Sequence, residues 1–141
     1  MQNALAGKRV LITQSSEFMG PVLCEVFAEQ GAAVVASSVS LLEPDAAARV
    51  VGQAGNIDVL VANLACTAPT TPAPDVGDDE WRNVFAYLVD PLPKLVRAAA
   101  PAMIERLWRI AGWLGVALTL VLSLGPPAFH TDLHQGDKLT H

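Results

Sequence analysis

Three short apolar runs, each separated from the next by a helix-like segment, constrain the fold of this chain more than any other feature. The runs cover residues 10–12, 33–36 and 57–62, and Asp58 is the one charged residue among them. A strand that is apolar at consecutive rather than alternate positions is buried on both faces, as in a parallel sheet covered by helices. The pattern therefore predicts an α/β fold, with ligands expected at the carboxyl ends of the strands.

Helices are predicted between and after these runs. The first begins at Gly20-Pro21, where proline fits because its missing N–H has no partner in a first turn, and Gly31 ends it. Residues 9–36 are thus expected to form one β-α-β unit. Further helices are predicted at residues 43–53, from residue 78 onward, and at about residues 94–106, with prolines at positions 91 and 93 separating the last two.

The composition excludes several classes of protein. The chain has 141 residues, which suits one domain, and its 52% apolar and 16% charged residues exclude a disordered chain. The net charge is -5 and no basic cluster occurs, so nucleic acid is not an expected partner. Cys24 and Cys66 form no CxxC, and the three histidines complete no zinc spacing. We therefore expect free thiols, no metal site and a cytoplasmic protein.

Three stretches resemble the short-chain dehydrogenase/reductase superfamily. Residues 7–13 followed by Gly20 resemble its first strand and loop, residues 57–63 its Asn-Asn-Ala-Gly strand end, and residues 80–103 its long interface helix. The resemblance implies a Rossmann-like, three-layer parallel sheet in a partial domain at residues 1–106, truncated after the interface helix. Residues 107–141 would then be a divergent apolar segment and a polar tail. Only 20 residues separate Ala36 from Ile57, so at least one element of that family is expected to be missing.

The loop after the first run departs from the phosphate-binding pattern of the superfamily, Thr-Gly-x-x-x-Gly-x-Gly. Gln14 and Phe18 replace two glycines that let the backbone approach pyrophosphate, and Glu17 would repel phosphate at the helix N-terminus. The pattern Thr-x4-Phe-x-Gly instead resembles the halohydrin dehalogenases, a branch that lacks the nicotinamide cofactor and binds halide in the vacated pocket. Two interpretations stay open at this point: a dehalogenase-like loop, and a degenerate loop in an ordinary reductase.

The resemblance also implies which residues would line this site. A vestigial nucleotide or halide pocket would be formed by Thr13, Ser15, Phe18, Met19, Gly20 and Asn63. The cofactor implied by the family is NAD(P), but the loop argues against tight binding. Ser37-Ser38 argues against it too, because an acidic residue that holds the ribose hydroxyls usually follows the second strand of an NAD-binding fold. We therefore expect very weak binding of NADH or NADPH.

The catalytic pattern of the superfamily is a Ser, then a Tyr that transfers the proton, then a Lys or Arg four residues later. The only tyrosine, Tyr87, is followed four positions later by Pro91 and is expected to serve helix packing or an interface. No catalytic residue is therefore predicted. The chain is expected to be a truncated, catalytically incomplete member of an oxidoreductase superfamily, whose full-length relatives would act on an alcohol, a carbonyl compound or a halohydrin.

The segment after Arg106 no longer resembles the superfamily, and residues 110–125 carry no charge. One interpretation is an unrelated tail that follows truncation, for example after a reading-frame shift. The other is a membrane segment, although Pro126-Pro127 leaves 16 uncharged residues where a span needs ~20. The expected partner is a second copy or a full-length relative, paired through the helices of residues 79–106. A non-catalytic partner subunit and a small membrane-anchored protein are thus the alternative functions.

Overall fold

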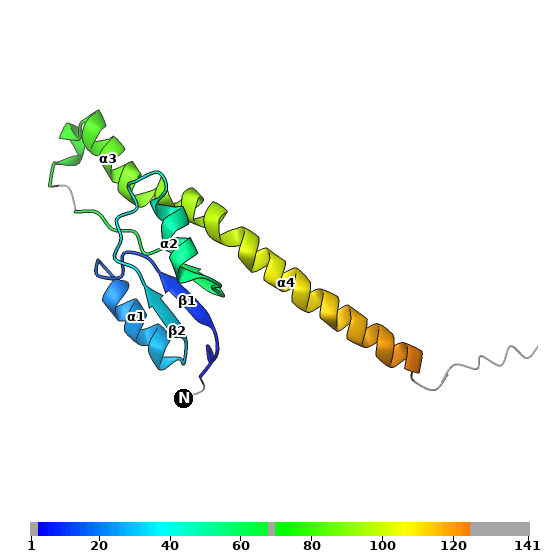
Figure 1. The fold of residues 1–141 in the computed structure, drawn as a ribbon. Coiled ribbons are helices and arrows are strands. Elements are labelled where there is room, and N and C mark those ends of the chain that lie inside the picture. The colour runs from blue at the N-terminus through cyan, green and yellow to red at the C-terminus, as the bar shows by residue number, and fades with distance from the viewer. Residues whose placement is uncertain (1–2, 68–69, 125–141) are drawn as a thin grey trace, which may run out of the picture. The chain divides into compact units, whose positions relative to one another are not determined.

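The computed structural model describes residues 3–67 and 70–124 of the chain (Figure 1). Its elements follow in the order β1 (Arg9–Ile12), α1 (Gly20–Glu29), β2 (Ala33–Ala36), α2 (Ala46–Ala54), β3 (Val59–Val61), a 3-10 turn (Ala73–Asp75), α3 (Asp78–Leu88) and α4 (Pro91–Leu124). The chain divides into two compact units, of which the first ends at Arg106 and the second begins at Leu107, so the boundary falls within α4. The predicted polar tail and Pro126-Pro127 lie outside the described residues.

The three strands form one parallel sheet in the order β2-β1-β3. Val10 of the central strand β1 pairs in register with Val34 of β2 and with Val59 of β3. The last three residues of β1 are fully buried, as a strand covered on both faces requires. The prediction of a parallel α/β sheet built from the three apolar runs is therefore confirmed.

Helices cover both faces of this sheet. Leu11 of β1 belongs to a buried cluster with residues of α2, of the loops on either side of it and of the first turns of α4, among them Leu41, Val50, Ile57, Leu95 and Ala99. Val10 and Ile12 point to the opposite face because side chains alternate along a strand. The helix α1 packs against β1 and β2, and a right-handed crossover places it on that second face. The result is the predicted three-layer, Rossmann-like arrangement.

The start of α1 requires glycine at position 20. A Cβ atom on Gly20 would lie 2.5 Å from the backbone oxygen of Ser15, closer than any real contact of a Cβ. Gly20 is also buried and donates its N–H to the Glu17 carbonyl at 2.8 Å. The loop after β1 therefore turns tightly beneath the first turn of α1, and the superfamily's last loop glycine keeps a physical function here.

The described residues between β2 and β3 contain one helix, α2, and no strand. Within the described sheet, β2 and β3 are consequently the two edge strands, and each pairs with β1 alone. An edge strand presents unpaired backbone groups on its outer side, so both edges are places where further chain could pair.

The long helix α4 differs from the prediction. We expected a helix from Lys94 to Arg106, with proline interrupting before it, but α4 runs for 34 residues from Pro91 to Leu124. Pro91 and Pro93 fall in its first turn, where a missing N–H costs no hydrogen bond. Pro101 stands inside the helix, where the loss of one backbone hydrogen bond is tolerated. Strong helix formers, mostly leucine and alanine, then continue the helix past Arg106.

Asp58 is the one charged residue within the apolar runs. It precedes β3 and contacts Arg9 of β1 and Arg106 of α4. One of its carboxylate oxygens accepts a hydrogen bond from the backbone N–H of Arg9 at 2.8 Å. The other lies 2.8 Å from a guanidinium nitrogen of Arg106 and 4.0 Å from the ammonium of Lys8. The hydrogen bond from Arg9 and the positive charges of Arg106 and Lys8 outweigh burial and hold the pKa of Asp58 below its ordinary value.

Candidate functional site

The loop after β1 keeps the backbone conformation of a glycine loop although it carries side chains. Gln14 has a φ of 43° and Phe18 a φ of 49°, and these are the non-glycine residues with positive φ in the described chain. Both stand where the superfamily has glycine. A non-glycine residue in this region is strained by roughly 1–2 kcal/mol. Strain of this kind persists where the surrounding structure holds the residue in place, and it commonly marks a functional site.

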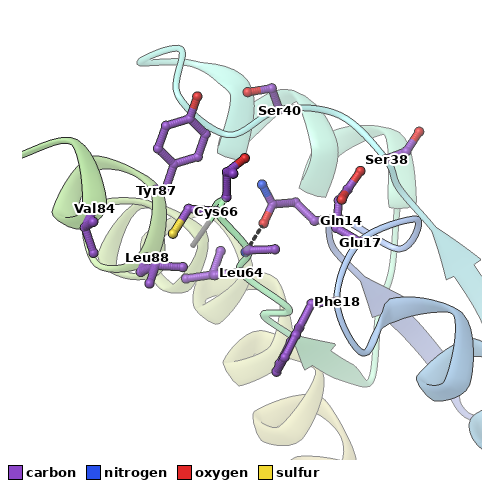
Figure 2. A pocket seen from close by; sticks show the side chains of 12 residues that line it. Gln14, Glu17, Phe18, Ser38, Ser40, Leu64, Cys66, Val84, Tyr87 and Leu88 are labelled. Atoms are coloured by element: carbon purple, nitrogen blue, oxygen red, sulfur yellow. Dashed lines mark hydrogen bonds between the residues drawn. The ribbon is translucent and has the colours of Figure 1, made fainter. Parts of the chain in front are cut away.

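The Gln14 side chain closes the loop from within. Its oxygen accepts a hydrogen bond from the backbone N–H of Ala65 at 2.6 Å, shown as the dashed line in Figure 2. Gln14 is buried, and the hydrogen bond itself is partly buried. The loop after β1 and the segment after β3 are therefore joined by a side chain at the position where a glycine loop would leave backbone open to pyrophosphate.

Asn63, at the end of the third run, holds the same loop. Its amide group donates hydrogen bonds to the backbone oxygens of Gln14 at 2.8 Å and of Glu17 at 3.0 Å. The Thr13 hydroxyl in turn donates to the backbone oxygen of Asn63 at 3.1 Å. Thr13 and Asn63 are both buried. Both amide hydrogens of Asn63 are thus engaged in shaping the loop.

A cavity of ≈ 800 Å³ opens at the carboxyl edge of the sheet, between this loop, the segments after β2 and β3, and α3 (Figure 2). Its lining includes polar and apolar side chains in nearly equal number: Gln14, Glu17, Phe18, Ser38, Ser40, Leu64, Ala65, Cys66, Thr67, Val84, Tyr87 and Leu88. This is where ligands are expected in an open α/β sheet. The volume is in the range of small-molecule sites in proteins, ~300–1,000 Å³.

The charge of the lining is unfavourable for phosphate. Among the described residues that line the cavity, Glu17 is the one carboxylate, and none is Lys, Arg or His. Glu17 also lies three residues before the start of α1, where the helix dipole would otherwise attract an anion. The remaining polar groups are hydroxyls, an amide and a thiol, which bind neutral polar molecules by hydrogen bonding. The cavity therefore suits a small, uncharged ligand better than a dinucleotide.

The six predicted site residues all lie in or beside the loop, but they differ in what they contact. Phe18 lines the cavity with its ring 80% exposed, and Figure 2 shows it at the edge of the group of lining side chains. The backbone N–H of Ser15 donates to the Ser37 oxygen at 2.9 Å, and Met19 is half-exposed. Of the six, Phe18 is the one that lines this cavity; Thr13, Gly20 and Asn63 build the loop behind it.

Eleven of the twelve lining residues did not figure in the predicted site, and Tyr87 and Cys66 are the two of them that carry a phenol and a thiol. Tyr87 was expected to serve helix packing or an interface, but the structure places it in the cavity wall, half-buried, together with Cys66. Tyr87 shares one helical face with Val84 and Leu88, which also line the cavity. Cys66 follows Asn63 by three residues, beyond the end of β3. The spacing of 84, 87 and 88, at i, i+3 and i+4, is the signal that places Tyr87 on this face.

Comparisons with known proteins were consistent with this architecture. No protein-family model matches the chain. It is 30% identical to a short chain dehydrogenase of Pseudocercospora fijiensis (strain CIRAD86), over 74% of this chain and 43% of that protein. It is 25% identical to the L-sorbose reductase of Gluconobacter frateurii, solved with NADPH and L-sorbose, with a TM-score of 0.64 over 75% of this chain and 51% of the other. A structure described as a dehalogenation enzyme is 26% identical, with a TM-score of 0.64 over 73% of this chain and 51% of that one.

These matches cover most of the first unit and stop short of the relatives' full length. The chain spans 43% of the curated relative and about half of each of the two solved structures. The order of its motifs, its parallel sheet and these similarities together place the chain in the short-chain dehydrogenase/reductase superfamily.

Proposed function

We propose that the 141-residue chain is a catalytically silent member of this oxidoreductase superfamily, whose cavity takes a small neutral ligand and not a dinucleotide. The observation that carries the proposal is the Gln14 side chain, which bonds Ala65 across the loop from a strained, glycine-like backbone conformation. The loop keeps the backbone conformation of a nucleotide-binding loop, but the Gln14 side chain occupies the space that the nucleotide would need. We propose that the predicted site is a vestigial nucleotide site that no longer binds nucleotide. Its residues are Thr13, Ser15, Phe18, Met19, Gly20 and Asn63.

The NAD(P) that the family implies does not fit the residues present. The L-sorbose reductase was solved with NADPH, and a dinucleotide in the same place here would bring its pyrophosphate to the Gln14 amide and the Glu17 carboxylate. Ser37 and Ser38 offer no carboxylate for a ribose, and the described residues that line the cavity include no cation for a phosphate. No step of the proposed function therefore uses a nicotinamide cofactor.

Two observations indicate the class of ligand: the side chains that line the cavity, and the similarity to a dehalogenation enzyme. Hydroxyls of Ser38, Ser40 and Tyr87 could bind an alcohol or a carbonyl oxygen, and Leu64 and Leu88 offer apolar contact. The loop pattern from Thr13 to Gly20 and the similarity to a dehalogenation enzyme favour a halohydrin within that class. Tyr87 is the only tyrosine of the chain and so the only phenol that could transfer a proton. Pro91 occupies the position four residues later, where a Lys or Arg would assist that transfer. We therefore propose binding without turnover.

Cys66 offers a direct test, because its thiol lines the cavity. In a Cys24→Ser background, the rate at which an alkylating reagent modifies Cys66 reports on occupancy of the cavity. A small halohydrin should slow the modification, and NADPH at the same concentration should leave it unchanged. Protection by NADPH but not by the halohydrin would contradict the proposal. Release of halide, or consumption of NADPH, above the background of a Tyr87→Phe variant would show that the chain is catalytic.

A second proposal concerns association. Large apolar side chains on α3 and the first turns of α4 are exposed, among them Trp81, Phe85, Leu88, Leu92 and Val96. They recur at helical spacing in the region that resembles the superfamily's interface helix, and the Trp81 and Phe85 rings lie 5.0 Å apart. We propose that a second copy of the chain, in the cytoplasm, covers this face; a full-length relative that presents the same face is the alternative partner. Exposed apolar patches of this kind mark interaction sites.

A further inference from the structure

Apart from Arg109 in its first turn, the part of α4 that follows Arg106 carries large apolar side chains on every side, and these are not buried in the described chain. Ten large apolar side chains in it are each more than half exposed: Leu107, Trp108, Ile110, Trp113, Leu114, Val116, Leu118, Leu120, Val121 and Leu122. The last three follow one another, and successive helical residues point in directions about 100° apart. The helical stretch Asp78–Ser123 contains an 18-residue window of mean hydropathy 1.2, of which 0% is buried.

A helix of this kind requires an apolar surrounding rather than a single apolar groove. A helix docked in a groove buries one stripe and keeps polar residues on the other side, whereas a helix that is apolar all round is a core helix or a membrane span. Because none of this window is buried, the helix is not a core helix of the described residues. The position of the helix, late in the chain, also excludes a signal sequence.

The length of the segment suits the bilayer. Residues 107–124 number 18 and, at ~1.5 Å per residue, extend for about 27 Å. The hydrocarbon core of a bilayer is ~30 Å thick, and a few Å thinner in some membranes. The uncharged residues 110–124 alone would be too few to cross the hydrocarbon core. Because α4 is continuous through Arg106, the turn from Leu107 to Ile110 lengthens the span. Arg109, in that turn, has a stem long enough for its guanidinium to reach the headgroups.

The charges and tryptophans lie at one end of the segment, as they do in membrane helices. Arg106 and Arg109 flank its N-terminal end, and residues 110–124 contain no Asp, Glu, Lys or Arg. Cytoplasmic flanks carry an excess of Lys and Arg, and tryptophan is enriched at the membrane–water interface. Trp108 and Trp113 both fall in the half nearest the arginines. This asymmetry sets a direction, with the first unit on the cytoplasmic side.

A polar side chain in the C-terminal half of the segment, Thr119, has its hydrogen-bond partner within the helix. The Thr119 hydroxyl donates a hydrogen bond to the backbone oxygen of Gly115 at 2.9 Å. In hydrocarbon every polar group must find its partner inside the protein, since no water is available. Threonine bonded to the carbonyl four residues earlier meets this requirement.

We propose that the helix of residues 107–124 inserts into a lipid bilayer and anchors the first unit at the cytoplasmic surface. The proposal is independent of the proposed ligand, because it rests on another part of the chain. The anchor is expected to hold the full chain on vesicles of phosphatidylcholine with a minor share of phosphatidylglycerol. A second copy that buries the same helix in water is the competing outcome.

Vesicle flotation of the full chain tests the proposal with two matched variants. Leu118→Lys places a charge at the centre of the segment, where insertion is strongly disfavoured, and Leu107→Lys places the same charge at the arginine end, where it reaches the headgroups. The wild type and Leu107→Lys should float with the vesicles and resist alkaline extraction. Leu118→Lys should reduce the bound fraction at least ~tenfold. Leu118 is exposed and lies outside the first unit, so circular dichroism should show the same fold.

A second measurement reads insertion depth. In a Trp81→Phe variant the remaining tryptophans are Trp108 and Trp113, and brominated acyl chains should quench their fluorescence. The proposal would be overturned if the wild type stayed at the bottom of the gradient, or if it formed soluble oligomers that vesicles do not capture. It would equally be overturned if Leu118→Lys floated as well as the wild type, because surface adsorption would then explain the binding.

Discussion

The side-chain oxygen of Gln14 lies 2.6 Å from the backbone nitrogen of Ala65, so the chain's own amide bridges the place where the superfamily's loop leaves room for pyrophosphate. Asn63 holds the loop from the other side through the carbonyls of Gln14 and Glu17. The loop is therefore held by buried and partly buried hydrogen bonds and is not a disrupted remnant. Its strain at positions 14 and 18 leads to the first prediction.

Phe18→Gly should stabilise the protein, because Phe18 is 80% exposed and gains little from packing while its φ is 49°. Glycine adopts this conformation freely, so the free energy of unfolding should rise by about 1 kcal/mol. Phe18→Ala is the control: it removes the same ring but keeps a Cβ in the strained conformation. Urea titration followed by circular dichroism measures both. Equal stability of the two variants would show that φ at position 18 carries no strain.

Gly20→Ala should destabilise the first unit. The new Cβ would meet the Ser15 backbone oxygen at 2.5 Å, and backbone cannot move aside as a flexible side chain can. The overpacking should lower the free energy of unfolding by about 1–3 kcal/mol. Gly52→Ala in α2 is the matched control, because nothing lies within 4 Å of its Cβ position and alanine favours a helix. A Gly20→Ala protein as stable as the wild type would contradict the described turn.

Asp58→Asn should destabilise the protein at neutral pH and lose that effect in acid. The folded-state pKa of Asp58 is lowered by the Arg9 hydrogen bond and by the charges of Arg106 and Lys8. A lowered pKa contributes stability above the unfolded pKa of about 3.9, and that contribution is lost as the pH falls through the folded value. Loss of hydrogen bonds to a charged group should cost about 1–3 kcal/mol at neutral pH.

Denaturation at a series of pH values measures this effect. The difference between the wild type and Asp58→Asn should be constant near neutral pH and shrink below about pH 4. Asp79→Asn is the control, because Asp79 pairs with Arg82 on an exposed surface and such pairs contribute about 0–1 kcal/mol. A difference that persists unchanged into strong acid would mean that Asp58 acts through packing rather than charge.

Charges placed on the apolar face of α4 should weaken association of the chain. Leu92 and Val96 are exposed on that helix one turn apart, and a second copy would bury both. Leu92→Glu combined with Val96→Glu should convert the associated species to monomer in mild detergent, as sedimentation velocity would show. Arg97→Glu changes charge at an adjacent position without removing an apolar contact and should leave association in place. Monomeric wild-type protein in the same detergent would rule out the proposed contact.

The fold could be predicted from the sequence because burial on both faces leaves a clear pattern. The runs at residues 10–12, 33–36 and 57–62 became β1, β2 and β3, and the short distance from Ala36 to Ile57 indicated a missing element. The glycine-like positions 14 and 18 were also evident, because a known loop pattern assigns a backbone conformation to each position. What that pattern could not show is that the Gln14 side chain turns inward and bonds Ala65.

The extent of α4 and the cavity wall were harder to predict, each for a physical reason. Proline in a first turn is compatible with a helix, so Pro91 begins α4 instead of interrupting it. Tyr87 and Cys66 meet in one cavity because α3 packs beside the segment after β3, a contact between distant parts of the chain. Local periodicity reports which residues share a helical face and does not report what that face contacts. The predicted site therefore contained the loop and omitted the opposite wall.

Titration with NADPH tests the central claim most directly. The comparison is between the wild type and a triple variant, Gln14→Gly with Glu17→Ser and Phe18→Gly, which restores the glycines and removes the carboxylate. Glu29→Ser, at the far end of α1, controls for the change in charge. The wild type should show no saturation below about 100 μM, and the triple variant should bind at least ~tenfold more tightly, a gain of about 1.4 kcal/mol. Saturable wild-type binding below about 10 μM, roughly −7 kcal/mol, or a triple variant that binds no better, would contradict the claim that these side chains have closed the dinucleotide site.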